Sequence, residues 1–429
     1  MGNTALHEAE NDSLLARKTR RVHSLAYPID THLDSLYVTR LTGCDFWAGD
    51  WRAKQWPLSM RLITATAPRG KNVPHFRHVG GPDFLHGGYG GACFAAHALW
   101  ENLFGARFGD PWSNWLTHRD YVHEIVGQSH GRLRLANTPQ AVRAAWADGV
   151  ASAILAVEGA HVLGGNGAST QAKRLARLGE LAKSGAAYVT LNHFSHTDIC
   201  RSGYLPMNPW RKGPAGLSAF GRDFVEHCME LGLLIDVSHT ADQAIIETAE
   251  LCLAHGVPLL ASHAASRTVS LNGGQPATPP RYLDRTLSDA AIRAIVETGG
   301  TISIILAPIF LNARILENGK PCMDVDLEYV VNYYERLASL IATMHVTADP
   351  WDHLSFGSDF DGGISSIPTG MQSGTDLIQL TRAMLAAGWP EERICRVYSG
   401  NFLRVWQGAK SASALPQRVI APKQEPEFA

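Results

Sequence analysis

Two histidines and a glutamate follow short, mainly apolar segments of this sequence, where each could bind a metal ion. Glu158 directly follows five apolar residues, and His239 and His263 each follow an apolar segment and a single serine. Imidazole and carboxylate groups are common protein ligands of zinc and similar divalent ions. A lone histidine of this kind is more often a hydrogen-bonded core residue, and a buried glutamate can instead be paired in a salt bridge. The shared pattern is therefore what indicates a metal site.

Three further positions extend the pattern. His32 and Asp34 form an H-x-D pair at the end of an apolar segment, and residues i and i+2 of extended backbone point to the same side. Both side chains could therefore reach one ion. His193 follows the segment 188–191 and Asp359 follows the segment 354–357. A carboxylate beside a metal-activated water can take up its proton and pass it to a leaving amine, which makes Asp359 a candidate acid–base residue.

The segments that precede these residues have the lengths and compositions of buried strands, and they alternate with helical patterns. Such alternation is typical of a parallel sheet with right-handed crossovers. We expect strands at residues 26–30, 92–96, 153–157, 188–191, 233–237, 257–261, 301–306 and 354–357, with a further strand at 132–136. We expect helices at residues 139–148, 171–184, 218–231, 240–255, 288–297, 326–344, 375–387 and 391–406. The sequence thus predicts an α/β protein with one TIM-like barrel of seven or eight βα units, whose reactive residues gather at the carboxyl ends of the strands.

One domain accommodates the whole series, because no linker interrupts it. We expect a flexible lead or frayed helix at residues 1–22, a single barrel domain at 23–410 and a polar tail at 411–429. A long insertion rich in tryptophan and glycine lies near strands one and two, at residues 40–135. Loops of this length are often lids or binding loops, and its aromatic residues could equally form a homodimer interface.

Composition restricts the class of function. The chain of 429 residues has a formal net charge of −2, which gives no reason to expect nucleic acid or an anionic membrane as a partner. The seven cysteines are odd in number and include no CxxC pair, which argues against a disulfide framework and a zinc–thiolate site. We recognise no signal peptide, transmembrane segment or lipid-anchor signal, so the expectation is a cytoplasmic protein.

Six motifs in order resemble the renal (membrane) dipeptidase family of the amidohydrolase superfamily. They are His32-x-Asp34, Val157-Glu158-Gly159-Ala160-His161, Tyr188-Val189-Thr190-Leu191-Asn192-His193, Leu234-Ile235-Asp236-Val237-Ser238-His239, Ala261-Ser262-His263 and Gly357-Ser358-Asp359-Phe360-Asp361-Gly362. The resemblance covers roughly residues 25–406 and implies a (β/α)8 TIM-like barrel and a zinc-dependent hydrolase of dipeptides.

The resemblance also implies roles for single residues. Two zinc ions would be bound, one by His32 and Asp34 and the other by His239 and His263, with Glu158 bridging them. A hydroxide between the ions would attack the peptide carbonyl, Asp359 would shuttle the proton, and His193 would bind substrate and stabilise the oxyanion. An arginine would bind the free carboxylate of the substrate. Arg285 matches the motif except that Thr286 replaces an asparagine, and Arg281 is the rival.

Departures from the family pattern leave other activities open. The segment 305–308, Ile-Leu-Ala-Pro, replaces the polar or aromatic residues expected after the seventh strand. An alternative is therefore a related metal-dependent amidase or deacylase that acts on N-acyl amino acids or modified dipeptides. A non-catalytic barrel is a third hypothesis, which the complete set of ligand candidates disfavours.

Overall fold

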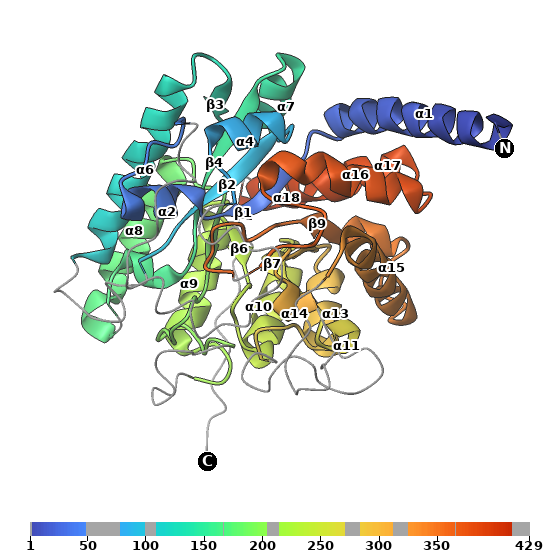
Figure 1. Cartoon of the computed structure of the whole chain (residues 1–429). Coiled ribbons are helices and arrows are strands. Elements are labelled where there is room, and N and C mark those ends of the chain that lie inside the picture. Colours follow the sequence, from blue (N-terminus) through green and yellow to red (C-terminus); the bar gives the residue numbers. More distant parts are fainter. Residues whose placement is uncertain are drawn as a thin grey trace, which may run out of the picture.

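Eight parallel strands form a nearly closed barrel in the computed structural model, which describes residues 2–48, 78–98, 109–165, 167–203, 214–270, 284–311, 325–364 and 366–413 (Figure 1). Neighbours pair in the order β1-β2-β4-β5-β6-β7-β8-β9. The strands are β1 (Ile29–Leu33), β2 (Gly91–Ala96), β4 (Ala151–Val157), β5 (Tyr188–Thr190), β6 (Leu234–Asp236), β7 (Leu260–Ala264), β8 (Thr301–Ile304) and β9 (Leu354–Phe356). The predicted TIM-like barrel is confirmed.

The ring closes where β1 meets the segment after β9. Leu33 forms a parallel bridge with Phe360, the Asp34 N–H donates to the Phe360 carbonyl at 3.0 Å, and the Asp359 N–H donates to the His32 carbonyl at 3.2 Å. Asp30 strengthens this seam, since its carboxylate accepts the Ser358 N–H at 2.8 Å and the Ser358 hydroxyl at 2.5 Å. These contacts hold the loop that carries Asp359 against the end of β1.

The strands are buried because helices cover them from outside. Every residue of β4 is buried, as expected of parallel strands with no solvent-facing side. The helices are α1 (Gly2–Ala26), α2 (Ser35–Thr42), α4 (Gly81–His86), α6 (Pro111–Gln128), α7 (Pro139–Ala147), α8 (Gln171–Lys183), α9 (Ala219–Glu230), α10 (Asp242–His255), α11 (Arg267–Ser270), α13 (Asp289–Glu297), α14 (Pro308–Leu311), α15 (Leu327–Thr343), α16 (Leu377–Ala386), α17 (Glu391–Cys395) and α18 (Asn401–Ser413). The expected N-caps are present: Ser218 accepts the Gly221 N–H, and Ser288 accepts the Ala291 N–H.

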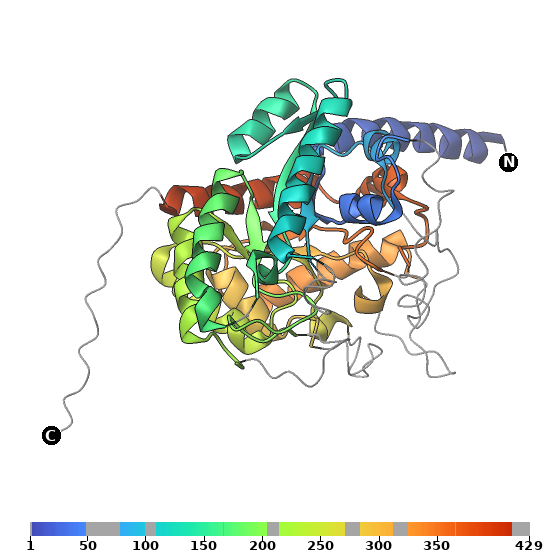
Figure 2. The ribbon, with the colours of Figure 1, turned by 90° about the vertical axis from the view of Figure 1, so that its left-hand side faces the viewer.

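The segment expected as a flexible lead or frayed helix at residues 1–22 is helical where the structure describes it. It belongs to α1, which begins at Gly2, continues to Ala26 and extends away from the barrel body (Figure 2). Val22, His23 and Ala26 in its last turns are buried, and the His23 ring lies 2.7 Å from the Thr381 hydroxyl of α16 and 2.8 Å from the Gly87 carbonyl. The helix therefore continues across residue 22, and its C-terminal end packs against α16.

Two other elements differ from expectation. The sixth barrel strand was expected at 257–261 but β7 runs to Ala264, because the polar groups of Ser262 and His263 have hydrogen-bonding partners inside the barrel. The last helix, expected to be continuous from 391 to 406, is interrupted by a π-helical segment, Arg396–Gly400.

The expected strand at 132–136 is β3 (Leu133–Leu135), which pairs with β4 outside the ring. Much of the long insertion, including residues 49–77 and 99–108, lies outside the described residues. Trp47 anchors one described part, since its indole N–H donates to the Ile125 carbonyl of α6 at 2.9 Å. Within the part of the chain that the structure describes, we find no helix with the length and apolar character needed to cross a membrane.

Candidate metal centre

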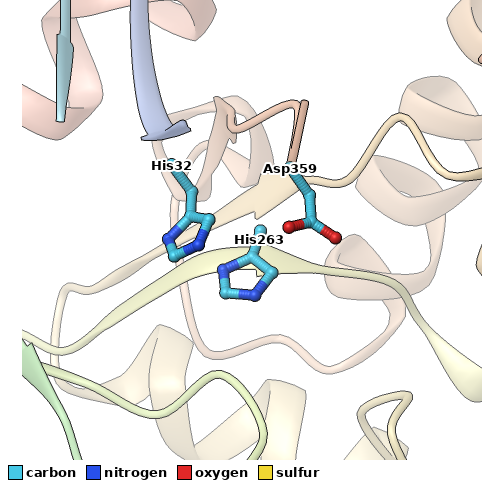
Figure 3. Close-up of side chains that lie close together, drawn as sticks. All are labelled: His32, His263 and Asp359. Atoms are coloured by element: carbon cyan, nitrogen blue, oxygen red, sulfur yellow. The ribbon is translucent and has the colours of Figure 1, made fainter. Parts of the chain in front are cut away.

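The barrel brings the candidate ligands to the carboxyl ends of its strands. His32 lies in β1 with Asp34 just beyond it, Glu158 directly follows β4, and His263 lies in β7. His193, His239 and Asp359 lie in the loops after β5, β6 and β9. Figure 3 shows His32, His263 and Asp359, from three separate segments, converging on one space.

One group of ligand atoms consists of His239, His263 and Glu158. The two histidine Nε2 atoms lie 2.9 Å apart, and they lie 3.1 and 3.2 Å from Glu158 Oε1. Ligands of a tetrahedral zinc ion with bonds of about 2.0–2.1 Å lie roughly 3.3 Å from one another. The three atoms are therefore spaced as the ligands of one ion.

A second group shares the same glutamate. His32 Nε2 lies 3.5 Å from Glu158 Oε1 and 3.7 Å from Asp34 Oδ2. A third grouping places Asp359 with His32 and His263, with ligand atoms within 4.8 Å of one another. All of these residues are buried. Glu158 thus lies between two sets of ligands, and Asp359 is beside both.

Several buried polar atoms at this site lack hydrogen-bonding partners among the described residues. They are His32 Nε2, Asp34 Oδ1, Glu158 Oε2, His193 Nδ1 and His239 Nδ1. Buried polar atoms are normally hydrogen-bonded, so a cluster of unpaired ones indicates that they bind an ion or another ligand. Nitrogen and oxygen donors of this kind suit a divalent cation, and the residues present therefore fit a metal centre.

The charges of the site are strongly coupled. Burial disfavours the charged form of His32, but Glu158 and Asp34 outweigh it and raise the His32 pKa well above its usual value. Burial likewise opposes ionisation of Glu158, yet His193 and His32 hold its pKa well below the usual range. Burial and then Arg285 lower the pKa of His239 to about 3. A neutral His239 and an ionised Glu158 are the forms that bind a metal ion.

Asp359 combines a strained backbone with a carboxylate that resists ionisation. Burial raises its pKa well above the usual range, and the nearby Asp34 and Glu158 add to the effect. Its φ of 61° is left-handed, which is uncommon for residues other than glycine and typical of functional sites. Gly362 makes room for this carboxylate, because a Cβ there would lie 2.0 Å from Asp359 Oδ1 and 2.8 Å from Asp34 Oδ2.

The predicted substrate-binding residues border the ligands. His193 Nε2 lies 3.4 Å from Glu158 Oε2. Arg285 is 5% exposed, and its guanidinium donates to the His263 carbonyl at 2.9 Å and lies over the Phe310 ring. The rival Arg281 lies outside the described residues.

Sequence reasoning missed the residues behind the ligands. The Tyr188 hydroxyl lies 2.9 Å from His32 Nδ1, and the Ser262 hydroxyl lies 2.8 Å from His263 Nδ1 and 2.7 Å from an oxygen of Asp236. The buried His161 also has a ring parallel to that of His193, with centroids 6.1 Å apart. The position of Ser262 next to His263 was a usable signal, whereas nothing in the sequence relates Tyr188 to His32.

Several known proteins are similar to this chain in sequence or in fold. The chain is 24% identical to Dipeptidase 3 of Rattus norvegicus over 342 residues, which covers 76% of this chain and 62% of the relative. The structure of the probable dipeptidase PvdM from Pseudomonas aeruginosa is similar, with a TM-score of 0.69 and 17% identity over 93% of this chain and 99% of that chain. A metallo peptidase from Rhodobacter sphaeroides, liganded with a phosphinate mimic of the dipeptide L-Ala-D-Ala, has a TM-score of 0.64 and 22% identity over 89% of this chain and 99% of that chain. At these identities the structural matches establish the fold.

The family model of membrane dipeptidases (peptidase family M19) matches residues 17–418, which is nearly the whole chain. The match spans every strand of the barrel and all of the candidate ligands. The chain therefore belongs to the membrane dipeptidase family, and it is a hydrolase of the metallo-dipeptidase class.

Proposed function

We propose that the chain hydrolyses dipeptides at a centre of two zinc ions. His32 and Asp34 would hold one ion, His239 and His263 the other, and Glu158 would bridge them. The observation that carries the proposal is the position of Glu158, whose Oε1 lies within 3.5 Å of the Nε2 atoms of three histidines. Bound zinc would supply an activated water as the nucleophile at neutral pH.

The remaining residues would act on the substrate itself. Arg285 would bind the free carboxylate, for which a planar guanidinium is suited because it can donate two parallel hydrogen bonds. The peptide bond would then lie over Glu158, and His193 would donate to the oxygen that becomes negative in the tetrahedral intermediate. Its Nε2 already faces this space, 3.4 Å from Glu158 Oε2.

Asp359 would transfer the proton from the attacking water to the leaving amine. Its environment supports this role, because burial and two neighbouring carboxylates make it a much stronger base than an ordinary aspartate. His32 and Arg285 act in the opposite direction on its pKa.

The test is hydrolysis of L-Ala-L-Ala, L-Ala-D-Ala and N-acetyl-L-alanine by the full chain. L-Ala-D-Ala is a natural choice, because the Rhodobacter sphaeroides relative was liganded with its mimic. We expect turnover of at least one dipeptide, its loss after chelation and its return when about two equivalents of zinc are added. Cleavage of N-acetyl-L-alanine without cleavage of any dipeptide would favour the amidase or deacylase alternative. No hydrolysis of any substrate by the zinc-loaded chain would contradict the proposal.

A further inference from the structure

His263 and His32 are fully buried, and the Nδ1 atom of each ring lies within hydrogen-bonding distance of a buried hydroxyl. His263 Nδ1 lies 2.8 Å from the Ser262 hydroxyl, and His32 Nδ1 lies 2.9 Å from the Tyr188 hydroxyl. Ser262 and Tyr188 are both fully buried. A hydroxyl can donate or accept, so its effect on a histidine depends on where its single proton goes.

The proton of Ser262 is directed away from His263 by a buried carboxylate. Asp236 Oδ1 accepts the backbone N–H groups of Ser238 and Ser262, at 3.0 and 2.8 Å. Its Oδ2 accepts the hydroxyls of Thr190 and Ser262, at 2.6 and 2.7 Å. With its proton on Asp236, the Ser262 oxygen can only accept from His263. His263 must therefore carry its proton on Nδ1 and present an unprotonated Nε2 to the metal position.

The same reasoning applies to His32 through a different acceptor. The Tyr188 hydroxyl donates to the Thr31 carbonyl at 2.9 Å, which leaves its oxygen to accept from His32 Nδ1. The Ser262 hydroxyl is more distant from His32 Nδ1, at 3.4 Å, so Tyr188 is the closer partner. In the neutral form that a metal requires, His32 is thereby held in the same tautomer, with its proton on Nδ1 and Nε2 left for the metal.

We propose that Ser262, oriented by Asp236, and Tyr188 are positioning residues that fix the metal-binding tautomers of His263 and His32, one for each ion. The inference rests on the proposed two-zinc centre. Metal-bound histidines commonly donate their other N–H to a carboxylate or carbonyl, and loss of such a partner typically lowers metal affinity about 10- to 100-fold. Here a hydroxyl is interposed, so a single oxygen atom can be removed without adding or removing a charge.

The test is zinc binding by Ser262→Ala and Tyr188→Phe, measured by competition with a chromophoric chelator. Each variant should bind one of its two zinc ions roughly 10- to 100-fold more weakly than the wild type. Anomalous scattering from crystals at limiting zinc should show which ion is bound more weakly. In Ser262→Ala the peak beside His239 and His263 should be reduced, and in Tyr188→Phe the peak beside His32 and Asp34 should be reduced.

Ser303→Ala is the matched control, because Ser303 is a buried serine of neighbouring β8 whose hydroxyl has no hydrogen-bonding partner among the described residues. It should bind zinc as the wild type does, and Ser262→Thr should restore most of the affinity. Nitrogen-15 spectra of zinc-free protein should show His263 protonated on Nδ1 in the wild type and as a mixture of tautomers in Ser262→Ala.

The outcomes separate this inference from the proposed function. A wild type that binds no zinc would contradict the two-zinc centre itself. If the wild type binds two ions and Ser262→Ala binds both with unchanged affinity, only the positioning role is refuted. It is also refuted if Ser262→Ala and Tyr188→Phe weaken the same ion, or if Ser303→Ala weakens zinc binding equally.

Discussion

Replacing Arg285 by methionine should abolish recognition of the free carboxylate of the substrate. Methionine keeps much of the apolar stem of arginine but has no donor. Arg285 is 5% exposed, so its hydrogen bonds to a substrate carboxylate are little screened by solvent. Hydrogen bonds to charged groups contribute about 1.5–3 kcal/mol each, and a bidentate pair would therefore contribute about 3–6 kcal/mol.

A loss of about 3–6 kcal/mol corresponds to a decrease in kcat/KM of roughly 10²- to 10⁴-fold. The assay compares a dipeptide with the same dipeptide amidated at its C-terminus. The wild type should prefer the free acid by about this factor, whereas Arg285→Met should cleave both at a similar, low rate. The surface variant Arg293→Met should keep the wild-type preference, since Arg293 lies on α13 and is partly exposed.

Zinc content must be measured in parallel, because Arg285 also donates to the His263 carbonyl. If Arg285→Met keeps its metal and still prefers the free acid, Arg285 does not bind the carboxylate. The rival Arg281 would then be the next residue to substitute. If the variant loses zinc, the contact with His263 explains the effect instead.

Four other substitutions test the site and the barrel that holds it. Glu158→Gln should reduce zinc from two ions to fewer than one per chain by elemental analysis, with activity at least about 10³-fold lower because metal stabilisation of the transition state is lost; retention of both ions would refute the bridge. Gly362→Ala should lower kcat/KM about 10²-fold by displacing Asp359, with little change in the urea midpoint, and normal activity would contradict the crowding at that carboxylate. Gly357→Ala should destabilise the fold by about 1–3 kcal/mol, since its Cβ would lie 1.9 Å from a backbone oxygen. Gly127→Ala on α6 meets nothing within 4 Å and should stabilise the fold by about 0.5–1 kcal/mol, and urea unfolding that reversed this order would contradict the packing.

The convergence of ligands could be predicted from the sequence because it follows from topology. The carboxyl ends of parallel strands meet at one end of a barrel, so His239 and His263, which follow neighbouring strands in the chain, had to lie close together. Their Nε2 atoms are 2.9 Å apart in the structure. Glu158 could be predicted for the same reason, since a carboxylate after a buried strand requires a partner.

Features that depend on contacts across the barrel could not be predicted in this way. The strand β7 was expected to end before Ser262 because two polar residues follow an apolar segment. Asp236 accepts both the N–H and the hydroxyl of Ser262, which keeps this residue in the strand, and the pairing becomes visible only once β6 and β7 are adjacent. The same holds for α1, whose buried turns contact α16 near the other end of the chain.

The central claim, that Glu158 joins two metal ions, is tested most directly by anomalous diffraction at the zinc edge from crystals of the wild-type chain. The account predicts two anomalous peaks per chain, one beside His32 and Asp34 and one beside His239 and His263, with the Glu158 carboxylate between them. A single peak at full zinc saturation, or two peaks that do not share Glu158, would contradict it.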